Sequence, residues 1–404
     1  MNYIQKGTKA FSLTNLALFA AGFITFANLY ITQPLLPQFA KEYGISPAIA
    51  SLSLSVATGV LAFSLLLFGS LSEAWSRKKL MTFSIFAASA LTLVLAFSPT
   101  FEVLLLLRIV QGFVFAGVPA IAMAYLGEEM EPTSLGAAMG LYISGNAIGG
   151  LSGRVIMGTM THYFNWQVGM ITLGILSLII CCYFVWALPE SKHFIPRPLK
   201  WKPLTHSLLA HLKNTQLLCL FGIGFTLMGS FVTMYNYIGF KLVEPPYNLN
   251  TAVVGWIFIV YLVGSWSSAW FGSLSDKFGR QRVLYIGILI MITGVVLTSP
   301  AHLSIKVIGL VIFTFGFFGS HSIASGWVSQ LANKDKAQAS SLYLFAYYMG
   351  SSISGTLGGV FWLNFGWSGI ILFISSALVV TFGLAMMIHF IQRTKHVTEV
   401  NMHS

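Results

Sequence analysis

The chain has 404 residues, of which 56% are hydrophobic and 8% are charged, and its formal net charge is +11 at pH 7. Soluble globular domains have about 25% charged residues, so this composition excludes a soluble protein and predicts a membrane protein. The lysines and arginines are divided among alternate connections rather than gathered on one basic face, which argues against a nucleic-acid partner.

Apolar runs recur along the whole sequence, and each is long enough to cross a hydrocarbon core, which takes about 20 helical residues. They predict an all-α membrane protein with about twelve transmembrane helices. In chain order the predicted spans are 12–34, 49–69, 80–98, 102–124, 135–159, 167–187, 215–238, 252–271, 283–299, 305–328, 339–362 and 368–391.

The basic residues predict the orientation of the chain. Most of them lie on the side of the termini, whereas Lys41, Lys241 and Lys306 lie on the opposite side. Because lysine and arginine are in excess on the cytoplasmic side, we expect both termini in the cytoplasm and the protein in the inner or plasma membrane.

One connection, 188–214, is longer than the others, is basic and holds four prolines. We expect it to be a cytoplasmic linker with a short amphipathic turn around Leu208–Leu212. It would divide an N-terminal six-helix bundle, 1–187, from a C-terminal six-helix bundle with a short tail, 215–404.

Enzymatic and ATP-driven functions lack their usual signals. Cys181, Cys182 and Cys219 lie in apolar segments without metal-ligand spacing, so we predict no disulfide and no metal site. No glycine-rich phosphate-binding loop of the Gly-x-x-x-x-Gly-Lys-Ser/Thr type is present. Catalysis would need an acid–base pair or an activated nucleophile within the spans, so we expect no enzyme, no catalytic residue and no cofactor.

A charged stretch between two apolar runs occurs twice. The first copy runs from Gly69 to Lys79 and the second from Gly272 to Arg282, 203 positions later. Leu141-Tyr142 likewise recurs as Leu342-Tyr343. Because both copies lie on the same side of the membrane, the halves form a parallel repeat about an axis along the membrane normal, as in rocking transporters.

These motifs resemble those of the major facilitator superfamily, in the twelve-span group that contains drug and sugar exporters. The family connection Gly-x-Leu-Ala-Asp-Arg-x-Gly-Arg-Lys between spans two and three is matched twice, with Ser76 in place of the second glycine in the first copy. Its Arg-x-x-Gln-Gly motif in span four is matched by Arg108, Gln111 and Gly112. The resemblance implies two pseudo-symmetric six-helix bundles and transport by alternating access.

The resemblance also implies that the duplicated connection is a gate, in which the arginine pairs with an acid at the end of span four. Glu128 or Glu129 could be that acid. From the residues alone, charges at a membrane boundary can pair across helix ends, or the basic residues can serve only to fix topology. The candidate gating residues are Gly69, Glu73, Arg77, Lys78, Glu128, Gly272, Asp276, Gly279 and Arg280.

Span five partly matches the family's antiporter motif. Gly145, Gly149 and Gly153 are in place, but Gly150 stands where the family has proline. Closely spaced glycines predict tight packing of this span against a neighbouring helix.

Two arginines lie within predicted spans. A buried arginine costs at least about 2.5–3.5 kcal/mol, so Arg154, in an otherwise apolar span, needs compensation. Arg108 and Arg154 lie at similar depths, roughly 8–9 Å from the outer ends of spans four and five. We expect both to line an electropositive central cavity suited to a carboxylate, phosphate or electron-rich substrate. Alternatively, Arg154 snorkels to the outer interface and Arg108 only bonds backbone carbonyls.

Other polar side chains within the spans could contact a small molecule by stacking and single hydrogen bonds, or serve helix packing. The candidate cavity residues are Asn28, Tyr30, Arg108, Gln111, Asn146, Arg154, Tyr235, Asn236, Tyr343 and Tyr347. His321 lies within span ten and is the candidate proton carrier, because its unperturbed pKa is near 6.5. Its alternative role is packing, with hydrogen bonds to neighbouring serines.

The sequence therefore predicts a secondary transporter that exports a small organic molecule across the bilayer, coupled to a proton gradient and acting as a monomer. A uniporter or importer of an organic anion and a lipid flippase remain alternatives, because the fold does not decide the direction. A non-transporting membrane sensor is a more remote one.

Overall fold

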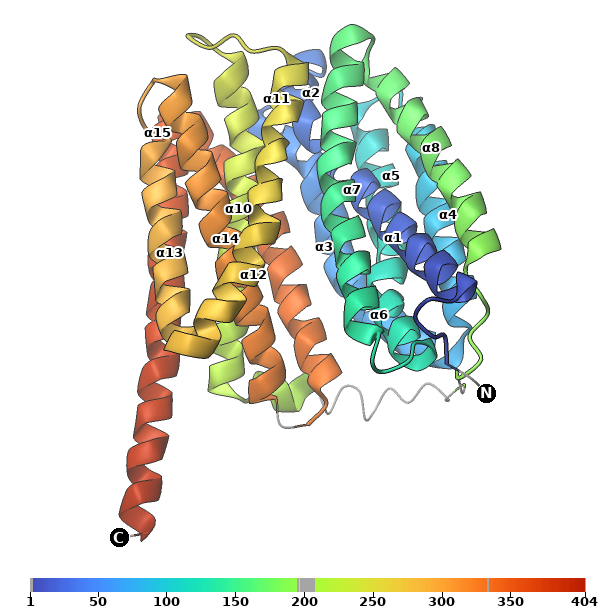
Figure 1. Ribbon diagram of the computed structural model, residues 1–404. Helices are drawn as coiled ribbons and strands as arrows, with labels where there is room; N and C mark the ends of the chain where they lie inside the picture. The colour runs from blue at the N-terminus through green and yellow to red at the C-terminus, as the bar shows by residue number, and fades with distance from the viewer. Residues whose placement is uncertain (1–2, 195, 197–207, 333, 404) are drawn as a thin grey trace. The chain divides into compact units, whose positions relative to one another are not determined.

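The computed structural model describes residues 3–194, 196, 208–332 and 334–403, with side chains described as far as residue 393. The described chain is almost entirely helical (Figure 1). Part of the predicted linker, 188–214, lies outside the described residues. Within its described part, residues 208–212 are helical, where the sequence predicts a short turn.

Apart from the linker between α8 and α10, short connections join successive helices along the chain. The first group is α1 (Lys9–Leu29), the 3-10 helix η1 (Gln33–Leu35), α2 (Leu36–Glu42), α3 (Pro47–Ala74), α4 (Arg77–Leu95), α5 (Phe101–Phe115), α6 (Gly117–Glu129), α7 (Leu135–Tyr163) and α8 (Trp166–Ala187). The second group is α10 (Thr215–Val243), α11 (Thr251–Trp256), the 3-10 helix η2 (Ile257–Val260), α12 (Tyr261–Phe278), α13 (Arg280–Leu297), α14 (Leu303–Leu331) and α15 (Lys336–His403).

The predicted spans all fall on these helices. Among the described residues, ten helical stretches are long and apolar enough to cross a membrane. The glycine-rich α7, which carries Arg154, is an eleventh helix of sufficient length. α15 contains two spans, because its backbone leaves the helical conformation at Gly366 (φ 56°, ψ −141°). The predicted all-α membrane fold is thus confirmed, whereas the cytoplasmic position of the termini stays a prediction.

Helix starts coincide with capping side chains, which satisfy backbone N–H groups that have no intrahelical acceptor. Each cap accepts a hydrogen bond from the amide three residues later. These caps are Thr8, Ser46, Ser76, Thr100, Asn165 and Asn250.

The duplicated stretch is less of a loop than its charge suggests. In the first copy α3 continues through Gly69 and Glu73, and only two residues separate it from α4. In the second copy Gly279 alone separates α12 from α13, with φ 83°. That left-handed conformation suits glycine, whereas Ser76 makes the first joint with negative φ and caps α4 instead. The two copies therefore differ in the shape of their turns.

The chain forms two compact units. Unit 1 comprises Met1–Leu199 with Ile238–Ile259, and unit 2 comprises Lys200–Tyr237 with Val260–Ser404. The sequence divides the chain differently, into 1–187 and 215–404, and that division stays a prediction.

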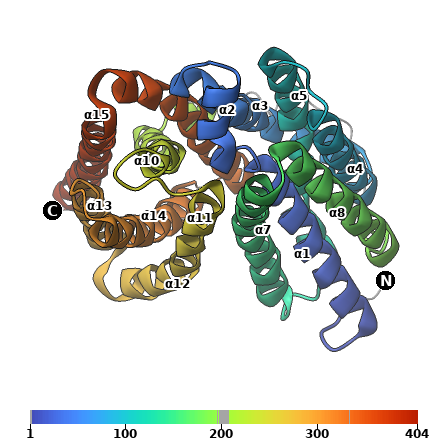
Figure 2. The ribbon, with the colours of Figure 1, turned by 90° about the horizontal axis from the view of Figure 1, so that it is seen from above.

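In unit 1, α7 packs closely along α1 (Figure 2). A side chain at Gly145, Gly149 or Gly153 would collide with the α1 backbone at Phe19, Phe23 or Ala27. α1 is therefore the neighbour that the glycines of span five predict. Farther along α7, a side chain at Gly158 would likewise collide with the backbone of Gly255 in α11.

In unit 2, α14 contacts α12, α13 and α15. Its Gly309 and Gly316 face the backbone of α13 at Gly294 and Gly287. Small residues on both sides again allow close backbone approach.

Candidate functional site

The first predicted span is interrupted. α1 ends at Leu29, and the chain turns through η1 into α2. Pro34 and Pro37 lie just beyond the break and lack the N–H groups that would continue the helical hydrogen bonds. Carbonyl groups at the end of α1 therefore need donors from elsewhere.

Arg108 of α5 supplies these donors. Its side chain is fully buried, and its Nη1 and Nη2 donate to the carbonyl oxygens of Asn28 (3.1 Å) and Leu29 (2.5 Å). Its Nε donates to the carbonyl of Ser53 in α3 at 2.7 Å. A cation at a helix C-terminus is also favoured by the helix dipole. Arg108 thus joins α5 to the end of α1 and to α3 through backbone carbonyls, the alternative role that the sequence leaves open.

A side-chain network continues from Arg108 across unit 1. Arg108 Nη1 donates to Oε1 of Gln111 at 2.8 Å, and Gln111 Nε2 donates to Oγ1 of Thr92 at 2.9 Å. Thr92 donates to Oδ1 of Asn28 at 2.7 Å, and Asn28 Nδ2 donates to Oγ of Ser177 at 2.8 Å. The structure therefore brings together the predicted residues Asn28, Arg108 and Gln111. The sequence missed Thr92 and Ser177, because single hydroxyls are common in membrane helices.

Arg154 of α7 holds the other side of the break. Its side chain is 2% exposed, and its Nε donates to Oε1 of Gln33 in η1 at 2.7 Å. Its guanidinium carbon lies 4.1 Å from the ring centre of Tyr30 and 4.7 Å from that of Phe258. Cation–π contacts with two rings compensate part of the cost of burial. Arg154 and Tyr30 are thus neighbours, and Gln33 and Phe258 are partners that the sequence did not assign.

Asn146 lies elsewhere on α7. Gly22 of α1 faces its amide oxygen and the ring of Tyr142, and a side chain at Gly22 would collide with that oxygen. Asn146 is therefore part of the contact between α1 and α7.

In unit 2, His321 lies in an aromatic cluster. Its Nδ1 is 2.9 Å from the hydroxyl oxygen of Tyr343. Its ring is parallel to that of Phe317, with the centres 6.0 Å apart, and lies 4.5 Å from that of Tyr347. The neighbouring hydroxyl of Ser322 donates instead to the carbonyl of Ser268. His321 therefore bonds the candidate cavity residue Tyr343, not the serines that its packing role would involve.

The cluster extends to α10. Phe317 stacks on Phe231 with their centres 3.8 Å apart, and Phe231 packs against Tyr235. The hydroxyl of Tyr235 lies 2.6 Å from Oγ1 of Thr314. Asn236, the next residue, is also buried. α14 and α15 thus bring the predicted residues Tyr343 and Tyr347 to His321, and the aromatic cluster connects them to Tyr235 of α10.

In the first copy of the duplicated stretch, Arg77 forms an ion pair with Glu128. Arg77 donates from Nη2 and Nε to the two carboxylate oxygens of Glu128, at 2.7 and 3.2 Å. Its Nη1 donates to the carbonyl and hydroxyl oxygens of Ser72, at the end of α3. Such a two-pronged pair is among the stronger polar contacts. Lys78 lies 3.8 Å from Glu190, and Glu73 is exposed.

In the described part of the chain, the second copy of the duplicated stretch has no corresponding ion pair. Asp276 is exposed, and among the described residues neither Asp276 nor Arg280 forms an ion pair. Gly272 faces open space, as does Gly69 in the first copy.

Glu129, which the sequence also offered as a partner of Arg77, instead contacts His193, a residue that the sequence did not assign. The buried Glu129 accepts from the backbone N–H of His193 at 2.8 Å, and its other oxygen lies 3.2 Å from Nδ1 of the same residue. Tyr3 stacks on the ring of His193. These contacts fasten the start of the linker and the N-terminal residues to the end of α6.

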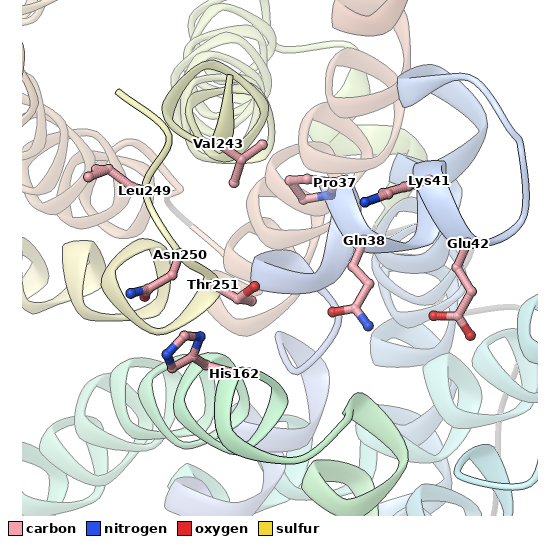
Figure 3. Close-up of a pocket in the computed structure, with 9 residues that line it drawn as sticks. All are labelled: Pro37, Gln38, Lys41, Glu42, His162, Val243, Leu249, Asn250 and Thr251. Carbon is pink, nitrogen blue, oxygen red and sulfur yellow. The ribbon is translucent and has the colours of Figure 1, made fainter. Parts of the chain in front are cut away.

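Unit 1 also contains a cavity of about 590 Å³ (Figure 3). His162 points from α7 toward the start of α11, and Lys41 and Gln38 approach from α2. Burial and the nearby carboxylate of Glu42 raise the pKa of the adjacent Tyr43, which keeps this phenol neutral. The sequence assigned none of the lining residues, which are Pro37, Gln38, Lys41, Glu42, His162, Val243, Leu249, Asn250 and Thr251.

Comparison with known proteins decides the family. The model of the Major Facilitator Superfamily matches residues 18–245 and 240–402. The chain belongs to the Major Facilitator Superfamily. This member of the superfamily is 52% identical over 385 residues to the MFS-type transporter YybF of Bacillus subtilis, covering 95% of each chain. It is 43% identical to the inner membrane transport protein YnfM of Escherichia coli, over 96% of this chain and 93% of that protein.

A more distant relative and a solved structure with a similar fold are also transport proteins. The multi-drug resistance efflux pump PmrA of Streptococcus pneumoniae is 25% identical over 89% of this chain and 91% of its own. The crystal structure of a bacterial homologue of the human lysosomal transporter Spinster, inward-facing and occupied, matches with a TM-score of 0.76 at 13% identity. That match covers 95% of this chain and 97% of the other, and shows the fold alone.

The family, the fold and the location predicted from the sequence are therefore confirmed. The chain is a multi-pass transporter of the cell membrane, with a small-molecule substrate and the lipid bilayer as its surroundings. Both its family and its fold are those of transporters.

Proposed function

We propose that this superfamily member is a proton-coupled exporter of a small organic molecule, which works by alternating access as a monomer. The observation that carries the proposal is the hydrogen bond between His321 and Tyr343 inside the aromatic cluster of unit 2. A titratable imidazole is combined there with aromatic rings that can stack on an organic molecule.

The charge of the buried side chains supports an anionic or electron-rich substrate. Among the described residues, the buried charged side chains are Arg77, Arg108, Glu129, Arg154 and Lys306. Of these, Arg77, Glu129 and Lys306 lie near the ends of α4, α6 and α14, so the two that lie well within the spans, Arg108 and Arg154, are both basic. Fixed positive charge in a low-dielectric region attracts anions. Arg154, with its aromatic neighbours Tyr30 and Phe258, is the proposed positive group of unit 1.

His321 is the proposed proton carrier. Protonation of its ring would turn the contact with Tyr343 into one in which the imidazolium donates and the phenol oxygen accepts. The charged ring would then lie among Phe317, Tyr343 and Tyr347, whose faces favour a cation. Proton binding and substrate binding would thus compete for the same aromatic surface, as antiport requires.

The ion pair between Arg77 and Glu128 is the proposed latch of the transport cycle. It connects the joint between α3 and α4 to the end of α6, so breaking it would free these helix ends to move. The export direction is supported by the relative PmrA, whose name describes an efflux pump.

Proteoliposomes with an acidic lumen test the proposal. An antiporter moves substrate toward the acidic side, so a substrate from a panel of antibiotics, dyes, sugars and organic anions should accumulate in the lumen. A protonophore should abolish the accumulation. His321→Asn should remove the dependence on the pH gradient, and Tyr343→Phe should weaken it. His302→Asn is the matched control, because His302 is exposed at the start of the same helix.

Other outcomes would favour the alternatives. Flux that equilibrates without regard to the gradient would indicate a uniporter, and accumulation from an acidic bath would indicate an importer. Unchanged gradient dependence in His321→Asn would exclude His321 as the proton carrier.

A further inference from the structure

Unit 2 contains a cavity of about 720 Å³ where α12 passes into α13. Its walls come from four helices, α12 to α15, and combine basic, amide and aromatic side chains. The lining includes Asp276, Phe278, Arg280, Gln281, Arg282, Trp327, Gln330, His389 and Gln392. The cavity lies beside the second copy of the duplicated stretch, at a polar end of membrane-spanning helices.

The two copies of the duplicated stretch differ in the hydrogen-bond acceptors available to the corresponding arginines, Arg77 and Arg280. In the first copy, both carboxylate oxygens of Glu128 accept from Arg77. Arg280 is the counterpart of Arg77 by the offset of 203. Glu128 lies one residue before the end of α6, and Gln330 lies one residue before the end of α14. The second copy therefore has an uncharged amide at the position of the acid.

Arg280 is left with an unsatisfied donor. Its Nη1 is buried and has no hydrogen-bond partner in the described part of the chain. A buried donor without an acceptor is unfavourable, and more so when it is charged. The Arg280 side chain also lines the cavity, so an anion bound there would lie next to this guanidinium group.

The charge of the cavity favours an anion. Arg280 and Arg282 outnumber the single carboxylate of Asp276 among the lining residues. His389 bonds Oε1 of Gln281 through Nδ1 at 2.9 Å. The amides of Gln330 and Gln392 lie in the same wall and can donate to oxygen atoms.

The apolar part of the rim favours a lipid as the source of the anion. Phe278 lines the cavity and is 56% exposed, and Phe390, next to His389, is also 56% exposed. Trp327 forms part of the wall, and tryptophan is enriched at the level of lipid headgroups. A phospholipid can place its phosphate on the arginines and its acyl chains along the aromatic side chains, which a free anion cannot do.

We propose that this cavity binds the headgroup of an anionic phospholipid, whose phosphodiester takes the place that Glu128 has in the first copy. Arg280 is the principal phosphate ligand, and Arg282 adds charge. In the first copy, Arg77 is thus paired with a carboxylate of the protein, whereas in the second copy Arg280 is paired with a lipid phosphate. The second copy is therefore sensitive to the lipid composition of the membrane.

Native mass spectrometry of the purified full chain tests the proposal, with phosphatidylglycerol and phosphatidylcholine titrated into detergent micelles. The wild type should retain phosphatidylglycerol in preference to phosphatidylcholine. An arginine near a membrane surface contributes about 1 kcal/mol to binding of anionic lipid, so Arg280→Gln should weaken retention about fivefold, and Arg282→Gln should weaken it further. Lys277→Gln is the matched control, since Lys277 is exposed on the same turn and does not line the cavity.

Gln330→Glu is the decisive second variant, because it restores the acid at the counterpart of Glu128. It should pair with Arg280 and reduce phosphatidylglycerol retention while both arginines remain. Wild-type retention in both Arg280→Gln and Gln330→Glu would overturn the proposal. So would displacement of the lipid by millimolar inorganic phosphate, which would identify the cavity as a site for free phosphate.

Discussion

Replacing Arg108 by methionine tests how much the end of α1 depends on one buried guanidinium. The change removes the hydrogen bonds that Arg108 donates to the carbonyls of Asn28, Leu29 and Ser53 and to Oε1 of Gln111. The methionine side chain fills a similar volume, so the loss of donors is the main perturbation.

The expected magnitude follows from two opposing terms. The acceptors at Asn28, Leu29 and Gln111 would be buried without Arg108 as donor, and each unsatisfied group costs about 2 kcal/mol, which makes about 6 kcal/mol. Removing a guanidinium from the membrane interior returns about 3 kcal/mol. Arg108→Met should therefore lower the free energy of unfolding by about 3 kcal/mol. Arg108→Lys should lower it less, because an ammonium keeps the charge but cannot reproduce the planar fork.

Unfolding by sodium dodecyl sulfate in mixed micelles, followed by tryptophan fluorescence, measures this difference. Lys79→Met is the control, because Lys79 is exposed in the first turn of α4 and a surface change should stay within about 0.5 kcal/mol. If Arg108→Met were as stable as the control variant, the capping of α1 by Arg108 would contribute nothing, and the reasoning would be refuted.

Two further predictions concern helix packing and the gate. Gly149→Ala should destabilise unit 1 by about 1–3 kcal/mol, because the new Cβ would collide with the backbone of Phe23. Gly140→Ala is the control, because Gly140 faces open space on the same helix and its replacement should not destabilise the protein. Thermal unfolding measures both variants, and equal effects would contradict the close packing of α1 on α7. A double-mutant cycle with Arg77→Gln and Glu128→Gln should give a coupling energy of about 1 kcal/mol that falls with added salt. Additive effects of the two substitutions would contradict the proposed role of this ion pair as a latch.

The sequence predicted the helices well because long apolar runs have few alternatives in a membrane. It predicted their ends less well. α3 passes beyond its predicted span through Glu73, since nothing in a hydropathy pattern marks where a membrane helix stops rather than continues into water. The interruption of span one was visible in Pro34 and Pro37, but the arginines that stabilise it come from α5 and α7.

Hydrogen bonds from side chains to backbone carbonyls could not be predicted from the sequence. Arg108 bonds three carbonyl groups, and every residue offers a carbonyl, so no pattern of residue types indicates which ones are used. The pairing of Arg77 with Glu128 was foreseeable because both partners are charged and the family resemblance relates them. The contact of His321 with Tyr343 joins two residues that were each proposed, and only the packing of α14 on α15 connects them.

Proton movement driven by the substrate alone tests the central claim most directly. Proteoliposomes that contain a pH-sensitive dye, with no imposed pH gradient, receive a permanently charged organic substrate from the bath. Proton-coupled antiport predicts that the lumen becomes alkaline as the substrate enters, and that His321→Asn removes the change in pH. Substrate entry with a constant or an acidifying lumen would contradict the account.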